Sequence, residues 1–265
     1  MSLAIVVGQA QAELRLCQHN PAQYAFRLEL VELILRRTAD QYGALRVAAP
    51  RGADPAQSRC LALLKDGQVD LAYVPPNAQR LRDFAAIRFD IQGGLTSYRL
   101  LLIHRDDAPR FAGVRDLDDL RALRGGFGNQ WSDFPLFALN RLPVIGSAYP
   151  ENLLAMLEQR RFDYYHRGLN EAWNEAREHP QLMVEPHLAL SYRQPVYFIF
   201  RRDNHALKER FEEGLREVLA DGSFQELFRR HFGELIERSR LDQRRVLQLR
   251  DELPPDEPPV KLLLP

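Results

Sequence analysis

A helix-to-strand pattern occurs twice in this sequence, at residues 58–74 and again at residues 151–165. In each copy an apolar helix face is followed by a turn and by a short strand that carries an aspartate, Asp70 or Asp163. The first helix ends at Gly67, a residue that commonly ends helices. Two such units far apart in one chain predict two similar α/β lobes. Because ligands of open α/β sheets bind beyond the strand ends, the pattern also predicts a ligand cleft.

The composition is that of a globular protein without a strong charge bias. The 265 residues suffice for one large or two modest domains, and 45% of them are hydrophobic, which argues against wholesale disorder. Lys+Arg and Asp+Glu both number 36, so no net field attracts nucleic acid or an anionic membrane. No apolar run approaches the length of a membrane span. We therefore expect a small molecule as the ligand and no nucleic-acid partner.

The N-terminus indicates export. Ala10-Gln11-Ala12 has the small-x-small form of a signal-peptidase site and follows a short apolar stretch, although no basic segment precedes that stretch. We interpret residues 1–12 as an export-signal remnant, with a disordered start as the alternative. The expected location is the periplasm.

Two cysteines, Cys17 and Cys60, are too few for a disulfide framework. Both lie in apolar surroundings, so we expect two buried thiols. A disulfide between them is the alternative, because the N-terminus points to an oxidising compartment.

Hydrophobic periodicity predicts further helices and strands outside the repeated pattern. The expected strands lie at residues 14–17, 45–49, 98–103 and 196–200, and the expected helices at 24–38, 114–122, 207–219, 223–232 and 235–249. Residues 125–133 read as a strand, a glycine loop and a helix start. The proline-rich tail, residues 251–265, is expected to be extended.

Three stretches, residues 61–74, 114–133 and 195–232, resemble the type II periplasmic solute-binding proteins, in particular the amino-acid-binding branch that serves ABC importers. The last is the most distinctive, because a strand, a helix, Asp221-Gly222 and a final helix follow at a similar spacing. The resemblance implies a two-lobed α/β fold with a ligand cleft between the lobes. Lobe 1 would be discontinuous, residues 13–97 plus 195–265, and lobe 2, residues 98–194, would be the insert.

The same resemblance implies hinge motion. The chain would cross between the lobes at residues 89–98 and 190–195. Gly93, Gly94 and Gln194 are the expected hinge residues. Gly93 and Gly94 suit the first crossing because glycines absorb large changes in φ and ψ, and Gln194 lies in the second crossing.

Relatives of this kind hold the carboxylate of the ligand with an arginine just beyond the third strand, and Arg80 stands at about that position. A guanidinium suits this role because its fork donates two parallel bonds to a carboxylate. A solvated Arg80, with Arg82 equally well placed, is the alternative. In the second lobe, unpaired N–H groups near Gly128 and Ser132 favour an anionic group, unless this is an ordinary helix cap. The expected ligand-binding residues are Pro75, Asn77, Arg80, Tyr98, Gly128, Asn129, Trp131, Ser132 and Arg167.

The sequence departs from these relatives where they often place an aspartate for the ammonium of the ligand. Counting five residues from Asp163 gives Gly168, beside Arg167, and the next carboxylate is Glu171. This departure favours an anion or a differently held polar solute over a free α-amino acid. Glu171 would reach an ammonium only from the next helical turn, and a solvated helix face is the simpler interpretation.

Catalytic and metal-binding patterns are weak. The seven histidines show no metal-ligand spacing, and the sequence contains no Gly-x-Ser-x-Gly elbow and no phosphate-binding loop. We expect no catalytic residues, no metal and no cofactor.

The sequence therefore predicts a monomeric, non-enzymatic periplasmic receptor that closes on a small polar solute, an amino acid or related carboxylate, and delivers it to the membrane permease of an ABC importer. One alternative is a sensory protein of the same fold that acts with a signalling partner. Another is a dehydratase that acts on a cyclic carboxylic acid in the cleft.

Overall fold

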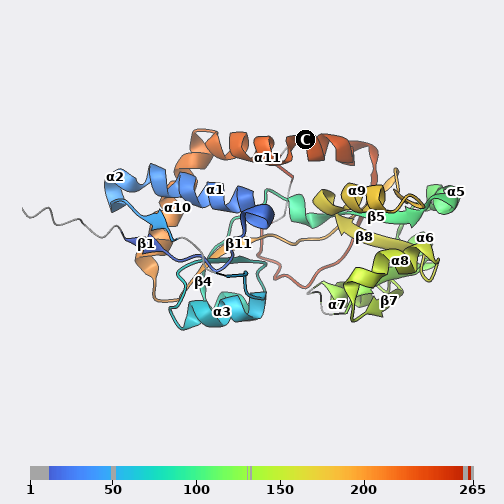
Figure 1. The fold of residues 1–265 in the computed structure, drawn as a ribbon, viewed down its shortest axis with the longest axis horizontal. Helices are drawn as coiled ribbons and strands as arrows, with labels where there is room; N and C mark the ends of the chain where they lie inside the picture. Colours follow the sequence, from blue (N-terminus) through green and yellow to red (C-terminus); the bar gives the residue numbers. More distant parts are fainter. Residues whose placement is uncertain (1–11, 49–51, 130, 132, 259–261, 264–265) are drawn as a thin grey trace, which may run out of the picture. The chain divides into compact units, whose positions relative to one another are not determined.

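The chain folds into two compact units (Figure 1). The computed structural model describes residues 12–48, 52–129, 131, 133–258 and 262–263. Unit 1 comprises Met1–Ile91 and Val196–His231, and unit 2 comprises Gln92–Pro195 and Phe232–Pro265. The boundary between His231 and Phe232 falls inside α11 (Ser223–Ser239).

In unit 1, four strands point in the same direction. β1 (Glu13–Leu14) pairs in parallel with β2 (Arg46–Val47), and a parallel bridge joins Leu16 to Leu71, directly before β3 (Ala72–Val74). β11 (Tyr197–Phe200) pairs antiparallel with both β3 and β4 (Ala85–Ile87), so β3 and β4 are parallel to each other. The carboxyl ends of β1, β2, β3 and β4 therefore meet at one edge, which we call the carboxyl edge of unit 1.

Helices cover both faces of these strands. Cys60 and Leu64 of α3 (Gln57–Lys65) pack in one cluster with Tyr197 and Ile199 of β11. The alternate residues Phe198 and Phe200 contact Phe211 of α10 (His205–Ala220). Because both faces are covered, all four residues of β11 are buried.

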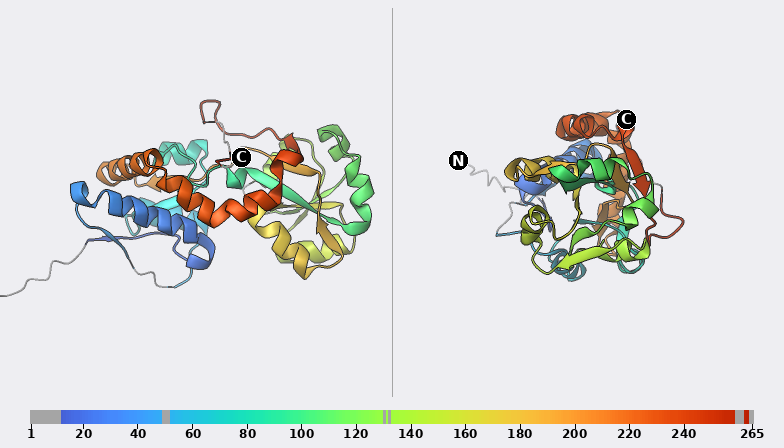
Figure 2. Two further views of the ribbon diagram at one scale, coloured as in Figure 1. Left: turned by 90° about the horizontal axis from the view of Figure 1, so that it is seen from above. Right: turned by 90° about the vertical axis from the view of Figure 1, so that its right-hand side faces the viewer.

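α10 lies alongside α1 (Pro21–Arg37), as Figure 2 shows. A Cβ at Gly214 of α10 would come within 2.7 Å of Ile34 Cγ2 and 2.9 Å of Thr38 Cγ2. Only glycine allows this close approach of the two helices. The four-residue α2 (Ala39–Tyr42) follows α1.

The expectation of two free thiols is wrong, because Cys17 and Cys60 form a disulfide with Cα atoms 5.7 Å apart. The structure places the end of the first strand against α3, so two residues separated by 43 positions become neighbours. Both cysteines are buried.

Unit 2 contains a seven-stranded sheet in the order β12-β10-β5-β8-β6-β7, with β9 also paired to β5. Its strands are β5 (Tyr98–His104), β6 (Gly125–Gly128), β7 (Val144–Ser147), β8 (Tyr164–Gly168), β9 (Leu182–Val184), β10 (Leu188–Ser191) and β12 (Arg245–Gln248). β5 is antiparallel to β8, β9 and β10, and the remaining pairs are parallel. The start of β5 therefore lies at the same edge as the carboxyl ends of the other strands, the carboxyl edge of unit 2.

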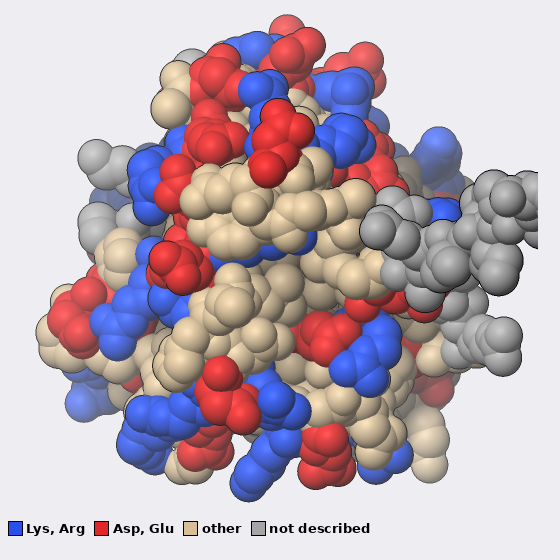
Figure 3. Space-filling model, turned by 90° about the vertical axis from the view of Figure 1, so that its left-hand side faces the viewer, with Lys and Arg blue, Asp and Glu red and all other residues tan. Residues whose placement is uncertain are grey.

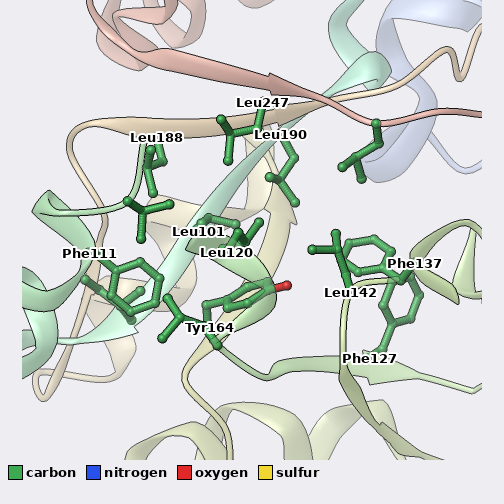
Figure 4. Close-up of a cluster of buried hydrophobic side chains, with 14 of the residues drawn as sticks. Leu101, Phe111, Leu120, Phe127, Phe137, Leu142, Tyr164, Leu188, Leu190 and Leu247 are labelled. Carbon is green, nitrogen blue, oxygen red and sulfur yellow. The ribbon is translucent and has the colours of Figure 1, made fainter. Parts of the chain in front are cut away.

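The core of unit 2 lies between this sheet and its short helices. Leu101, Leu188, Leu190 and Leu247 come from three neighbouring strands and share one buried cluster with Phe111 and Phe137 (Figure 4). The helices are α5 (Ala108–Ala112), α6 (Leu117–Arg121), α7 (Phe134–Leu139), α8 (Leu153–Glu158) and α9 (Leu169–Glu178). Asp116 caps α6, because its Oδ1 accepts the N–H groups of Asp118 and Asp119.

The expected helix over residues 235–249 is wrong. α11 ends at Ser239, Arg240 has a φ of +47°, and residues 245–248 form β12 in parallel with β10. Pairing with β10 thus overrides the helical pattern of the isolated segment. As a result the compact units assign residues 232–265 to unit 2, whereas the sequence placed them in lobe 1.

The segments expected to be hinges have definite contacts. Gly93 and Gly94 have φ values of +54° and +83°, which disfavour any other residue. Thr96 Oγ1 donates to the carbonyl oxygen of Gln194 at 2.7 Å, and the side chain of Gln194 accepts a bond from Arg99. Their role as hinges stays a prediction.

The surface mixes charges. On the face drawn in Figure 3, acidic and basic side chains are interspersed, which agrees with the equal numbers of the two kinds in the sequence. Within the described residues, no helix has the length and apolar character that crossing a membrane requires.

The disulfide predicts a measurable dependence of stability on reductant. Closing a loop of this length removes conformational entropy from the unfolded chain, which corresponds to about 4 kcal/mol in the chain-entropy model. We expect the free energy of unfolding in urea to fall by about that amount when reductant is added. The double variant Cys17→Ser, Cys60→Ser should match the reduced protein and show no response to reductant; an equal response in the variant would contradict the assignment.

Candidate functional site

The carboxyl edge of unit 1 collects residues that follow β1 and β3. Gln18 joins the two strand ends, because its Nε2 donates to Tyr73 O at 3.1 Å and its Oε1 accepts from Tyr73 N at 3.2 Å. The hydroxyl of Tyr73 donates back to the carbonyl oxygen of Gln18. These bonds fix the position of the turn that begins at Pro75.

Arg80 lies on α4 (Ala78–Asp83), directly after this turn. Asn77 caps the helix, because its Oδ1 accepts the N–H of Arg80 at 2.8 Å. The guanidinium of Arg80 donates to Pro75 O at 2.6 Å and to Gln57 Oε1 at 2.7 Å. Burial lowers the pKa of Arg80. Both acceptors are uncharged, and none of the described carboxylates pairs with this guanidinium.

Arg82 differs from Arg80 although both lie on α4. Its side chain is exposed and donates to Gln79 Oε1 at 2.7 Å. The structure therefore separates two arginines that the sequence treated as equally well placed, since only Arg80 is held against the end of β3.

The sequence analysis missed Tyr24 and Arg27, which also lie at this edge. The guanidinium carbon of Arg27 lies 5.0 Å from the ring centre of Tyr24 and 5.3 Å from that of Tyr73. Burial lowers the pKa of Arg27, while the charges of Tyr73, Tyr24 and Asp90 act in the opposite direction. The spacing of Tyr24 and Arg27 gave no clear signal, because Tyr24 has non-helical φ and ψ of −123° and 20° at a kink of α1.

At the carboxyl edge of unit 2, the register brings together residues from distant parts of the sequence. Arg99 of β5 lies opposite Gly168 of β8, and Tyr98 lies opposite Ser191 of β10. β6, which ends at Gly128, is parallel to β8. Of the expected binding residues, Tyr98, Gly128, Asn129 and Arg167 therefore share this edge.

Trp131 and Tyr165 form a stacked aromatic pair at this edge, in which Tyr165 is buried and the guanidinium of Arg167 lies over both rings. Their rings stack with centres 6.1 Å apart and an angle of 18° between planes. A Cβ at Gly128 would lie 2.8 Å from Trp131 Cε2, so the indole requires a glycine there. Asn129 extends the pairing of β6, because its N–H donates to Ser147 O at 2.9 Å. Ser132 lies outside the described residues.

Arg167 is paired with carboxylates. Its Nε donates to both oxygens of Glu175 at 2.9 and 2.7 Å, and its Nη2 contacts Glu171 Oε1 at 2.9 Å. Burial lowers the pKa of Arg167, but the bond to Glu175 and the charge of Glu171 outweigh burial and raise it. One arginine with two glutamates leaves one surplus negative charge, so this group favours a cationic rather than an anionic ligand group.

Glu171 also reaches the position where the sequence lacks a carboxylate. Its Oε2 accepts the N–H of Gly168 at 2.9 Å, as the third residue of α9 does in a capping box. Glu171 is therefore bonded to the protein, while 42% of its side-chain surface stays exposed as expected of a solvated helix face.

At the start of α7, where the sequence predicted an anion site, the structure places the carboxylate of Asp133. Asp133 directly precedes this six-residue helix, and its Oδ2 accepts the hydroxyl of Tyr192 and lies 3.8 Å from Arg99 Nη2. A negative charge at this place opposes the binding of an anion. α7 alone therefore offers no anion site.

The imidazole of His166 lies between Phe127 and Phe137, with ring centres 4.4 and 4.6 Å away, and next to Trp131. The imidazole is buried, and its Nδ1 has no hydrogen-bond partner in the described part of the chain. Burial lowers the pKa of His166 to about 3, so the imidazole is neutral at physiological pH. Its chemistry is that of a core side chain.

Comparisons with known proteins connect this fold to solute-binding proteins. No family model matches the sequence, and no curated protein matches it. Among solved structures, a mutant of the arginine-binding protein of T. maritima is 15% identical, with a TM-score of 0.54 over 84% of this chain and 95% of that chain. The substrate-binding protein AbpA of Streptococcus pneumoniae, bound to L-arginine, is 16% identical, with a TM-score of 0.54 over 85% and 96%.

A third structure comes from work on glutathione import via GshT and the cystine ABC importer TcyBC of Streptococcus mutans. It is 13% identical, with a TM-score of 0.56 over 84% of this chain and 95% of that chain. At these identities the likeness shows the fold. The predicted fold class, the α/β fold of type II periplasmic binding proteins, is thereby confirmed.

The buried imidazole predicts a pH dependence of stability. His166 binds a proton near pH 6.5 in the unfolded chain but only near pH 3 in the folded one, so the unfolded state binds more protons between these values. Stability should therefore fall as the pH drops through this window, by up to about 1.4 kcal/mol per unit. His166→Phe, measured by urea unfolding from pH 4 to pH 7, should show a slope reduced by that amount. An unchanged slope would contradict the prediction.

Proposed function

We propose that the protein is an extracytoplasmic receptor that binds a small polar solute, an amino acid or a related carboxylate, for an ABC importer. The observation that carries the proposal is the guanidinium of Arg80 at the carboxyl edge of unit 1. It is partly buried, oriented by two uncharged acceptors and unpaired with any described carboxylate. A ligand carboxylate supplies the partner that such a group lacks.

The residues at the carboxyl edge of unit 2 also suit a polar ligand, but they favour apolar and cationic groups where Arg80 favours a carboxylate. The partly exposed ring of Trp131 suits contact with an apolar or cationic part of a solute. The surplus carboxylate of the Arg167, Glu171 and Glu175 group suits an ammonium. In this proposal Arg167 orients the carboxylates and does not bind an anion itself.

The disulfide supports a location outside the cytoplasm, because structural disulfides persist in oxidising compartments. The segment Ala10-Gln11-Ala12, on which the predicted export signal rests, extends beyond the described residues, which begin at position 12. Delivery to a permease belongs to the same proposal, and Gly93, Gly94 and Gln194 stay its proposed hinge residues. The fold shared with amino-acid importer receptors is compatible with this proposal.

Arg80→Ala tests the proposal directly. Loss of the guanidinium leaves the ligand carboxylate without its charged partner, so affinity for the best L-amino acid or carboxylic acid of a thermal-shift screen should fall roughly thirty- to a thousand-fold. Isothermal titration calorimetry measures this change. Without solute, the free energy of unfolding should change by only about 1 kcal/mol, because Arg80 donates to uncharged acceptors.

Arg82→Ala is the matched control, since it removes an arginine from the same helix without touching the end of β3. Its affinity should equal that of the unsubstituted protein, and Arg80→Lys should recover only part of the loss because an ammonium lacks the fork. Equal affinity in Arg80→Ala and Arg82→Ala would remove Arg80 from the site.

A further inference from the structure

We infer that Arg27 is a second anion-recognising residue at the carboxyl edge of unit 1, and that the solute carries two acidic groups. The inference rests on the proposed function and specifies its substrate class as a dicarboxylate or an acidic amino acid. It is carried by the hydrogen-bonding state of Arg27, by its position relative to Arg80, and by the contrast with other arginines of the chain.

The guanidinium of Arg27 has no hydrogen-bond acceptor within the described residues, although a guanidinium carries five N–H donors. Its contacts are the rings of Tyr24 and Tyr73, which attract the cation at 5.0 and 5.3 Å. Ring faces hold the planar group but leave its donors without oxygen acceptors. A partly buried charge in this state gains from an added anion.

The carboxylates of Asp54 and Asp90 lie within electrostatic range of the cluster formed by Arg27, Tyr24 and Tyr73. Both accept hydrogen bonds from other residues. Asp54 accepts the N–H groups of His19 at 3.0 Å and Asn20 at 3.1 Å, and lies 2.9 Å from His19 Nδ1. Asp90 accepts the N–H of Val196 at 2.9 Å. Neither accepts a hydrogen bond from Arg27. They moderate the local charge without saturating the guanidinium.

Arg27 and Arg80 flank the same strand end. Arg27 contacts the ring of Tyr73 in β3, and Arg80 is bonded to the carbonyl oxygen of Pro75, two residues further along the chain. Asp54 and Asp90, which follow β2 and β4, influence the same cluster from the same edge. The two guanidinium groups therefore belong to one edge, where ligands of α/β sheets bind.

The state of Arg27 differs from that of three other arginines that are not fully exposed, Arg99, Arg167 and Arg193. Arg167 pairs with Glu175, and Arg99 donates to Gln194 and lies near Asp133. Arg193 donates to both oxygens of Asp251. Each of these arginines has an acceptor from the protein, whereas Arg27 contacts aromatic rings and no acceptor among the residues that the structure describes. The missing acceptor of Arg27 is the feature that a second acidic group of the solute would supply.

Pairs of acids and their amides test the inference. The probes are L-glutamate with L-glutamine, L-aspartate with L-asparagine, and succinate with succinamate, because each pair differs in one acidic group at nearly constant shape. Calorimetry should show that the protein binds at least one acid more tightly than its amide. In Arg27→Gln, affinity for that acid should fall roughly ten- to a hundred-fold while affinity for the amide changes less than threefold.

Two further measurements separate recognition from structure. Arg27→Lys keeps the positive charge against the tyrosines and should retain part of the preference for the acid. Arg82→Gln, on an exposed arginine of the same unit, should behave like the unsubstituted protein. Urea unfolding identifies any variant that has lost its fold. If Arg27→Gln does not fold, the inference is tested by whether the unsubstituted protein and Arg27→Lys bind the acid more tightly than its amide.

The outcomes distinguish the inference from the proposed function. If amides or other L-amino acids bind as well as the acids, or better, the inference fails and the receptor proposal stands. If Arg27→Gln weakens acid and amide equally, Arg27 only supports Tyr24 and Tyr73, and the inference also fails. If no L-amino acid and no dicarboxylate binds at all, both fail.

Discussion

The direction of the strands is the constraint on which the candidate site depends. In each unit the carboxyl ends of parallel strands meet at one edge, and the helices that connect such strands cover both faces. The faces are consequently apolar, as the four buried residues of β11 and the buried run Leu100–Ile103 of β5 show. Polar chemistry is left to the edge, where the turns after the strands carry arginines, tyrosines and carboxylates. The fold therefore determines where the candidate site lies, and the residues at that edge determine which ligand it favours.

The charge state of each edge follows from how its arginines are satisfied. A partly buried guanidinium loses hydration, and the loss is offset only by acceptors close to its N–H groups. In unit 2 the acceptors are carboxylates of α9, so Arg167 is neutralised and one negative charge remains. In the described part of unit 1, Arg80 donates to uncharged acceptors and Arg27 contacts aromatic rings, and neither pairs with a carboxylate. The two edges thus differ in the sign of the charge they favour, although both are built on parallel strand ends.

Local signals in the sequence predicted the parts of this structure that depend on local order. The two helix-to-strand patterns became α3 with β3 and α8 with β8, because a helix end, a turn and an apolar strand are set by neighbouring residues. The disulfide was only the alternative to two thiols, because the approach of Cys17 to Cys60 depends on the packing of α3 against the strands. β12 was mistaken for helix, because only its pairing with β10 makes residues 245–248 a strand. The sequence indicated Arg80 as a candidate ligand-binding residue. It gave Arg27 only as part of the expected helix over residues 24–38, because nothing in that pattern indicates that its side chain lies against two tyrosines.

The treatment of Gly168 shows why counting along the sequence was insufficient. A fixed spacing from Asp163 ends at the last residue of β8, where a glycine leaves no carboxylate, but α9 begins at the next residue. A glutamate in the first turn of a helix reaches back to the N–H that precedes it, and Glu171 does so with one oxygen while the other accepts from Arg167. Both oxygens are therefore engaged, and a ligand ammonium would have to share them. An ammonium gains less from this arrangement than from a free aspartate, whereas an acidic group gains fully from a guanidinium without an acceptor. Among the described arginines of the two edges, Arg27 of unit 1 is the one without an acceptor, and the proposed acidity of the solute rests on this guanidinium.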